Sequence, residues 1–423
     1  MTKIKRIYAY EIIDSRGYPT IEGRLLLDTG VEVNTSVPAG TSIGKYEAVE
    51  LRDKDQQRFK GMGVLQPVSY INTLIGPKLI GISPSKLVDI DLWLIKADET
   101  KDKSKLGANT TLLISQLVTK AAAKEQGVSL FRFLNGVYKQ LFKSEIKLER
   151  IPTPIFSVIN GGKHANNDLD FQEFQIIPTS SFQFSKALQF GVDFFHQLLK
   201  VLEYRNASIS VGVEGGFTPN FATNFDALEV IKETIIQMKY QVAVDIFLGL
   251  DIAATHFYKE SSYHIKDSAH PLNQTEYYNF IQNLLKKYAP LVIEDPFDQD
   301  DWSNWNKLNG IVSKETYLVG DDLIASSKDR LLRALKEKSC STLLIKPNQI
   351  GTITETLEVI DIARKNNINY IISQRSGETN DSFIADLAVG VQSDFVKFGA
   401  PSRGERVAKY NRLWEIEREE LKK

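Results

Sequence analysis

Seven apolar runs in the second two-thirds of the chain each end in a charged residue. The residues that end them are Glu214, Asp251, Glu294 with Asp295, Asp321 with Asp322, Lys346, Arg375 and Lys397. A charge at the end of a buried strand is costly unless several such ends meet around a polar ligand or a metal. The runs recur about every 20 to 45 residues and alternate with helical patterns. This arrangement predicts βα units of a barrel whose strand ends converge on one face.

The first 140 residues follow a different pattern, which predicts a separate α+β domain. Strands are expected at 3–14, 20–28 and 31–37, and helices at 65–80, 83–97 and 109–126. Asn109 is the expected N-cap of the last helix, and Gly127 is its expected stop. Residues 141–154 carry alternating charge and two prolines, as a connector does. We therefore expect an α/β chain with an α+β domain at 1–140 and a barrel at 141–423.

Composition narrows the classes of function. The 423 residues carry a net charge of −1, so nothing global indicates nucleic acid as a partner. No apolar run approaches the roughly 18 residues of a membrane span, and the first residues lack the pattern of a secretory leader. The single cysteine, Cys340, excludes an internal disulfide and favours a reducing, cytoplasmic compartment. It is either a small buried residue or a reactive thiol. The five histidines show no spacing typical of zinc ligands, which argues against a zinc site.

The charged strand ends suggest specific chemistry. Asp251, Glu294 and Asp321 offer hard oxygen ligands from separate strands, which suits magnesium. The alternative is three unrelated strand-end acids or helix caps. Lys346 and Lys397 close otherwise apolar strands, and a lysine beside another cation is a usable base because its ammonium form is disfavoured. Surface lysines are the alternative.

Three further segments carry candidate residues, each with a plain alternative. Residues 37–53 form a glycine-punctuated loop that offers the hydroxyl of Ser42, although a simple surface loop explains the same pattern. Residues 159–178 place His164, Gln172 and Glu173 between two predicted strands, where a polar hairpin loop is the alternative. Glu214 precedes two glycines, and its alternative is a capping or loop acid. Arg375 and Ser376 could hold a phosphate by a charged fork and a hydroxyl.

The motifs in their order resemble the enolase family over nearly the whole chain. They are DSRGYPT (14–20), VPAGTSIGKYEAVELRD (37–53), NGGKHANN (160–167), QEF (172–174), EGGFTPN (214–220), LGLD (248–251), IEDPFDQDDW (293–302), GDDL (320–323), LLIKPNQIGTITE (343–355), SQRSGET (373–379) and KFGAP (397–401). The resemblance implies a modified TIM-type (β/α)8 barrel whose first units depart from plain βα order, with an N-terminal α+β capping domain. It also implies a glycolytic lyase that dehydrates 2-phospho-D-glycerate, a phosphorylated hydroxy acid, to phosphoenolpyruvate. Two magnesium ions per active site are implied, the second arriving with substrate, and so is a homodimer or an octamer of dimers.

The resemblance assigns roles residue by residue. Asp251, Glu294 and Asp321 match ligands of the first magnesium, and Ser42 matches a serine that reaches the second. Lys346 matches the base that removes the C2 proton, and Glu214 matches the acid that assists departure of the C3 hydroxyl. The residues that match substrate-binding positions are His164, Gln172, Glu173, Arg375, Ser376 and Lys397.

The sequence also departs from the family pattern at the site. Gln374 stands where histidine is usual, Val213 where an acid is usual, and His256 where glutamate is usual. Glutamine can hydrogen-bond but cannot titrate near neutrality. These departures leave two alternatives open besides the lyase. One is a weakly catalytic binding protein that docks a surface partner through Lys422 and Lys423. The other is an acid-sugar dehydratase of the same superfamily.

Overall fold

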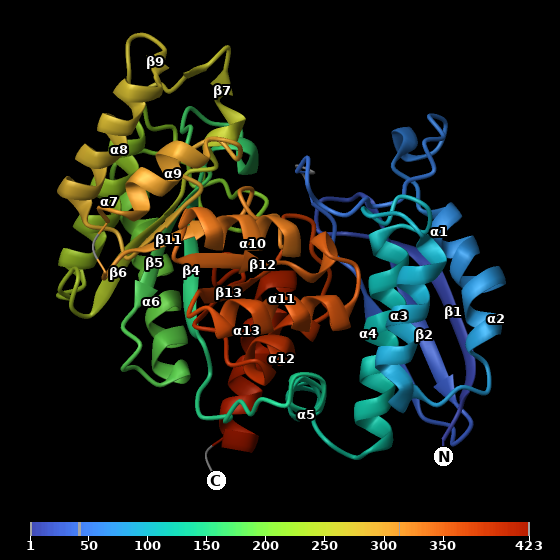
Figure 1. Ribbon diagram of the computed structural model, residues 1–423. Coiled ribbons are helices and arrows are strands. Elements are labelled where there is room, and N and C mark those ends of the chain that lie inside the picture. The colour runs from blue at the N-terminus through green and yellow to red at the C-terminus, as the bar shows by residue number, and fades with distance from the viewer. Residues whose placement is uncertain (1, 41–43, 313, 422–423) are drawn as a thin grey trace.

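The computed structural model describes residues 2–40, 44–312 and 314–421. Its N-terminal part is an antiparallel sheet in the order β1 (Ile4–Ile13), β2 (Pro19–Leu27) and β3 (Glu32–Ser36). Helices cover this sheet beside the barrel (Figure 1). Helices α1 (Leu65–Ser69), α2 (Gly76–Leu79) and α4 (Ala108–Glu125) contact the sheet, α3 (Leu87–Asp98) packs on α4, and α5 (Leu130–Phe142) leads from α4 to the barrel. The three strands and the three helical regions predicted for this part are confirmed.

In the described part of the chain, eight strands close into a barrel, as predicted. In chain order they are β4 (Thr153–Asn160), β5 (Glu173–Pro178), β6 (Ile246–Asp251), β10 (Val292–Glu294), β11 (Tyr317–Gly320), β12 (Thr342–Ile345), β13 (Asn369–Ser373) and β14 (Phe395–Lys397). β5 runs antiparallel to both its neighbours, β4 and β6, whereas the other neighbouring pairs are parallel. The first units therefore depart from plain βα order.

Helices surround the barrel, and a small sheet projects from it. The helices are α6 (Phe184–Tyr204), α7 (Asn224–Gln237), α8 (Gln274–Tyr288), α9 (Trp302–Asn309), α10 (Lys328–Glu337), α11 (Ile353–Lys365), α12 (Phe383–Gly390) and α13 (Gly404–Ile416). The projecting sheet consists of β7 (Tyr258–Lys259), β8 (Ser262–Tyr263) and β9 (Leu272–Asn273), which Figure 1 shows above α8. Among the described residues, no helix is both long and apolar enough to cross a membrane.

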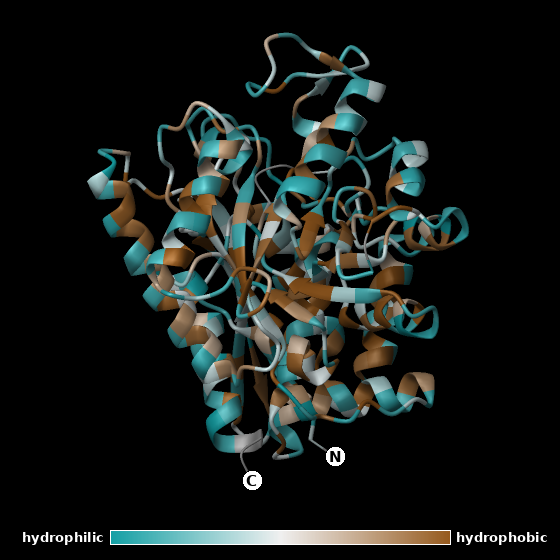
Figure 2. Ribbon diagram, turned by 90° about the vertical axis from the view of Figure 1, so that its left-hand side faces the viewer, coloured by the Kyte–Doolittle hydropathy of each residue, from teal (hydrophilic) through white to brown (hydrophobic). Residues whose placement is uncertain are grey.

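Apolar side chains fill the barrel interior below the charged strand ends. Ile155, Ile177, Val292, Val319, Leu344, Ile371 and Phe395 form one buried cluster, each from a different strand. Most are β-branched, which suits a pleated wall. Figure 2 shows brown strands inside and helices of mixed colour outside. This apolar cluster fills the middle of the barrel. The polar residues follow at the ends of the strands, so the site lies at one face of the barrel.

The structure corrects two local expectations and adds one helix. The apolar run 209–214 is not a strand. Val211 makes only an isolated bridge to Phe217, and Glu214 lies in the turn between them. The N-cap of α4 is Gly107 rather than Asn109, because the Asn109 carbonyl accepts from the backbone N–H of Leu51 instead. Helix α5 was not predicted from the sequence, and Cys340 is buried, in agreement with the first of its two alternatives.

Hydrogen bonds join the two parts of the chain near the site. Ala39, which follows β3, pairs its backbone with Gly377 after β13. Asp91 of α3 accepts hydrogen bonds from Ser115 of α4 and from Thr354 at the start of α11. The N-terminal domain is therefore fixed to the barrel on the side where the polar strand ends lie.

Candidate active site

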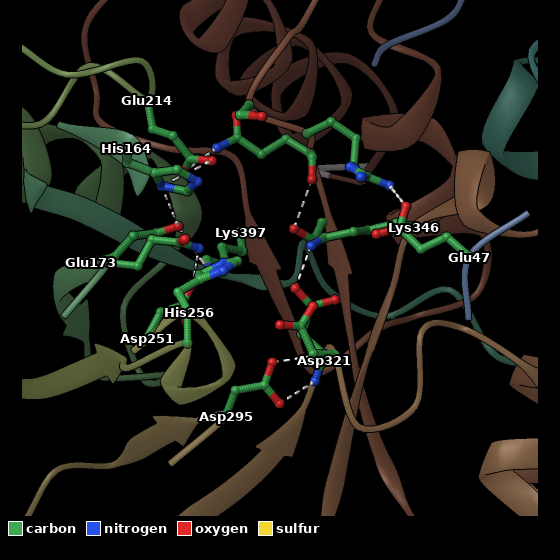
Figure 3. A pocket seen from close by; sticks show the side chains of 17 residues that line it. Glu47, His164, Glu173, Glu214, Asp251, His256, Asp295, Asp321, Lys346 and Lys397 are labelled. Carbon is green, nitrogen blue, oxygen red and sulfur yellow. Dashed lines mark hydrogen bonds and ion pairs between the residues drawn. The ribbon is translucent and has the colours of Figure 1, made fainter. Parts of the chain in front are cut away.

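The charged strand ends meet in one pocket, as the sequence predicted. Strand register explains the meeting, because Glu294 on β10 pairs directly with Asp251 on β6, and Glu173 on β5 pairs with Asp251 from the other side. Figure 3 shows these side chains pointing into a common space, together with Lys346 and Lys397. All of the predicted site residues that the structure describes, except Glu294, line the pocket directly, and Glu294 contacts it through Lys397. Ser42 lies outside the described residues.

The floor of the pocket is an ion cluster centred on Lys397. Its ammonium lies 2.9 Å from Asp251, 2.9 Å from Glu294 and 3.1 Å from Glu173. Burial alone would lower the pKa of Lys397, but the three carboxylates raise it well above its usual value. Burial raises the pKa of Glu294, and the neighbouring Asp251 adds to the effect. Lys397 is therefore a permanent cation, and the sequence-based view of it as a base is not supported.

Lys346 forms a separate ion pair. Its ammonium contacts Oδ2 of Asp321 at 2.5 Å, and the other oxygen, Oδ1, is buried without a hydrogen-bond partner among the described residues. Burial lowers the pKa of Lys346, but the attraction of Asp321, with a further contribution from Glu294, leaves the net pKa raised. The sequence predicted a disfavoured ammonium. The structure instead favours the ammonium, because Asp321, which follows a different strand, lies next to Lys346 after folding.

An imidazole and two carboxylates form the opposite wall. Nδ1 of His164 lies 3.6 Å from Glu173 and 3.6 Å from Glu214, as the dashed lines in Figure 3 mark. Burial lowers the pKa of His164 to about 4, so its ring is neutral at physiological pH. Burial also raises the pKa of Glu173, with a further contribution from Glu214. The turn that presents Glu214 depends on Gly215, whose φ of +87° disfavours a side chain.

Two hydrogen bonds in series, from Arg406 of α13 to Gln374 and from Gln374 to Glu214, hold Glu214 in place; we call them the bridge. Arg406 is fully buried and donates to Oε1 of Gln374, and the Gln374 amide donates to Oε2 of Glu214 at 2.7 Å. Arg406 also donates to the backbone carbonyls of Val213, Arg375 and Ser376. The bridge therefore ties the turn of Glu214 to the segment after β13.

Arg375 forms the edge of the pocket that faces the N-terminal domain. Its guanidinium donates to Glu47 at 2.7 Å and to Asn348 at 3.2 Å. A Cβ at Gly40 would lie 1.9 Å from the same guanidinium, so a side chain there would displace Arg375. Ser376, beside it, also lines the pocket. The N-terminal domain thus completes the site by positioning a cation.

Two family models match the chain. The model of the enolase C-terminal TIM barrel domain matches residues 149–423, and that of the enolase N-terminal domain matches residues 4–134. Together they cover nearly the whole chain. The chain belongs to the enolase family.

Family membership supports a lyase-type enzyme, and this pocket is its candidate active site. Several residues of this enolase-family site escaped the sequence analysis. Glu47, Asn348 and Arg406 each hold another site residue, and they come from segments far apart in the chain. Glu47 and Asn348 lie within the quoted motifs at 37–53 and 343–355, which was the only sequence signal for them. Spacing along the sequence could not reveal the pairing of residues 27 to 328 positions apart.

The site residues fit a divalent cation. Asp251, Glu294 and Asp321 end adjacent strands, and no described residue forms a hydrogen bond with Oδ1 of Asp321, which leaves this oxygen available as a ligand. Oxygen donors of this kind suit hard cations such as magnesium. In the structure Lys397 lies between Asp251 and Glu294, so the three acids do not form a closed cluster. Gln172 donates to Asp251 at 3.2 Å and orients that carboxylate.

Proposed function

We propose that the chain catalyses the reversible, magnesium-dependent dehydration of 2-phospho-D-glycerate to phosphoenolpyruvate. One observation carries the proposal. Lys346 and the pair Glu173–Glu214 lie on opposite sides of one buried pocket, with Lys397 between them (Figure 3). A base and an acid on opposite faces of a bound substrate are what removal of a proton and a hydroxyl from adjacent carbons requires.

The proposed steps assign a proton transfer to each side. Nζ of Lys346, as the neutral amine, takes the proton from C2, and the electrons of that C–H bond move onto the substrate carboxylate. A cation held by Asp321 would favour the neutral amine, because it would offset the attraction that raises the pKa of Lys346. As the C3–O bond breaks, those electrons form the C2–C3 double bond, and the hydroxyl leaves as water with a proton supplied from the side of Glu214. His164 and Glu173 contact Glu214 and keep it oriented.

Positive charge lines the path of the substrate. Proton removal beside a carboxylate builds negative charge, which fixed cations stabilise without reorganisation. Lys397 is placed to meet the substrate carboxylate, and Arg375 with Ser376 to hold the phosphate. Asp251, Glu294 and Asp321 would hold one magnesium ion, and Ser42 is the predicted ligand of a second. The bound ions would supply further positive charge at the substrate carboxylate and phosphate.

A coupled assay with magnesium tests the proposal. We expect Lys346→Ala to lower kcat by about a hundredfold to ten-thousandfold, because that is the usual contribution of a positioned base. Lys328→Ala is the matched control, since Lys328 is a half-exposed lysine on α10 that pairs with Glu358. Wild-type activity no greater than that of Lys346→Ala would contradict the proposal. So would equal losses in the two variants.

Three other expectations remain predictions. They are the homodimer or octamer of dimers, the cytoplasmic location, and docking of a surface partner through Lys422 and Lys423. Those two lysines lie outside the described residues, and nothing in the described part of the chain favours the binding-protein alternative over the lyase.

A further inference from the structure

A second cavity, of about 480 Å³, lies in the N-terminal domain. Its lining residues come from the start of the chain, from the segment 78–83, and from Lys86 and the start of α3. None of these described residues lines the active-site pocket. Figure 1 shows the start of the chain at the edge of the N-terminal domain that faces away from the barrel. The volume falls within the range of about 300 to 1,000 Å³ that is typical of small-molecule sites.

Apolar side chains form the floor of this cavity. Leu79 and Ile90 are buried, and Ile82 and Trp93 are partly buried against the hydrophobic core. Ile90 and Trp93 are three positions apart on α3 and therefore lie on the same face of that helix. Because part of the indole of Trp93 stays accessible, an aromatic ring in the cavity can stack against it.

Three lysines surround the apolar floor. No described residue forms an ion pair with the ammonium of Lys3, Lys78 or Lys86. Nζ of Lys78 lies 5.9 Å from the ring centre of Trp93, near the limit of about 6 Å for a cation–π contact. Asp89, the acidic residue among those that line the cavity, lies in the first turn of α3, where the helix dipole stabilises a carboxylate. The cavity therefore has an excess of positive charge beside an apolar floor.

A larger groove between the domains, of about 790 Å³, lacks this excess. Its cationic side chains already have carboxylate partners, which are Asp300 for Lys45 and Arg330, Asp329 for Lys101, Glu355 for Lys103 and Glu358 for Lys328. An anion in that groove would have to compete with these carboxylates. The cavity in the N-terminal domain offers its three lysines without such competition.

We propose that the cavity in the N-terminal domain binds a small aromatic carboxylate. The ring of the ligand lies against Trp93, and its carboxylate faces the three lysines. An inorganic anion has no apolar body to cover the floor, and a neutral aromatic compound leaves the lysines unpaired. The site is independent of the proposed reaction, because it shares no described residue with the active-site pocket.

Equilibrium dialysis of the full chain with 2-naphthoate tests the ligand class. We expect a Kd of about 1 mM or below, which is within reach of a ligand of this size. The neutral isostere 2-naphthamide should bind at least about threefold more weakly, because it cannot pair with the lysines. Octanoate, a carboxylate without an aromatic ring, should also bind at least about threefold more weakly. Inorganic phosphate at the same concentration should not displace 2-naphthoate.

Substitution of two lysines tests the charged part of the site. Lys78→Met combined with Lys86→Met keeps the apolar stems and removes two charges. It should weaken binding of 2-naphthoate about threefold to twentyfold and leave binding of 2-naphthamide unchanged. Lys96→Met is the matched control, because Lys96 is an exposed lysine of the same helix that does not line the cavity.

Fluorine resonances locate the ligand. The chain has four tryptophans, so protein labelled with 5-fluorotryptophan gives four resonances, and Trp93→Phe identifies that of Trp93. Added 2-naphthoate should shift this resonance and leave the other three in place. Phenylalanine retains an aromatic ring, so Trp93→Phe should bind 2-naphthoate within about threefold of wild type, whereas Trp93→Ala should bind about tenfold more weakly.

The site is supported if binding weakens in the double lysine variant, persists in Lys96→Met and shifts the Trp93 resonance. Equal affinity for 2-naphthoate and 2-naphthamide overturns the proposal, and so does equal affinity in wild type and the double lysine variant. Octanoate that binds as tightly as 2-naphthoate overturns the aromatic class. Binding that leaves the Trp93 resonance in place, or no binding at about 5 mM ligand, overturns the site itself. These measurements contain no magnesium and no 2-phospho-D-glycerate, so their outcome is separate from that of the coupled assay.

Discussion

At the scale of single residues, Gln374 is the departure that the structure explains best. In the sequence, Gln374 replaces the histidine that is usual in the family, so a group that titrates near neutrality is absent. In the structure both ends of its amide are used, one by Arg406 and the other by Glu214. A histidine here would lie against the buried Arg406 guanidinium, which disfavours its protonated form. The glutamine is therefore a bridge, and its neutrality is no handicap.

We expect Gln374→Leu to lower kcat/KM about tenfold to a hundredfold, equivalent to about 1.4 to 2.7 kcal/mol of transition-state stabilisation. Leucine leaves Arg406 and Glu214 each without one partner. Gln374→His is the control, because a neutral ring can accept from one side and donate to the other. It should stay within about threefold of wild type and add no new inflection to the pH–rate profile. Equal kcat/KM for leucine and wild type would rule out the bridge.

At the scale of elements, two helical glycines provide a matched pair. Gly136 of α5 is exposed, and a Cβ added there meets nothing within 4 Å. Gly191 of α6 faces β4, and its Cβ would lie 2.4 Å from the ring of the fully buried Phe156. Helix propensity favours alanine at both positions by about 0.5 to 1 kcal/mol, so only packing separates them.

We expect Gly136→Ala to raise the free energy of unfolding by about 0.5 to 1 kcal/mol. Gly191→Ala should lower it by about 0.5 to 2 kcal/mol, because overpacking a core typically costs about 1 to 3 kcal/mol. Urea unfolding of both variants measures the difference. A gain in stability at Gly191 would show that Phe156 can move, and that α6 is less tightly seated than the structure indicates.

The same scale shows what the sequence could and could not predict. The meeting of strand-end residues such as Asp251 and Glu294 was predictable, because the carboxyl ends of parallel strands lie at the same face of a barrel. The run ending at Glu214 looked like another strand, yet Gly215 turns the chain there and tertiary contacts hold the turn. Arg406 was missed, because its partners come from segments that are adjacent only after folding.

At the scale of the whole molecule, Asp91 lies in the joint between the domains. It is fully buried, and Thr354 of the barrel and Ser115 of α4 both donate to its Oδ2. Oδ1 has no partner among the described residues. Burial raises the pKa of Asp91 to about 6 from a usual value of 3.8. The folded state therefore holds a proton that the unfolded state has released between those two values.

The sign of the pH effect follows. The contribution of Asp91 to stability is greatest below about pH 3.8 and is lost as pH rises through about 6. Measured by urea unfolding, the stability of wild type minus that of Asp91→Asn should fall by about 1 to 2 kcal/mol between pH 5 and pH 7.5. Taking the difference cancels other titrating groups. A difference that grows with pH would mean that the hydrogen bonds from Thr354 and Ser115 stabilise the ionised carboxylate instead.

The ammonium of Lys397 among three carboxylates has a consequence for how the protein is made. Many metal sites are bare clusters of like charge that repel until an ion arrives, so the chain cannot fold first. Here the chain carries its own counter-ion, covalently attached and always present. Synthesis and folding can be complete in a cell short of metal. Under the proposed magnesium dependence, supply of the ion would control the activity of the folded protein and not its folding.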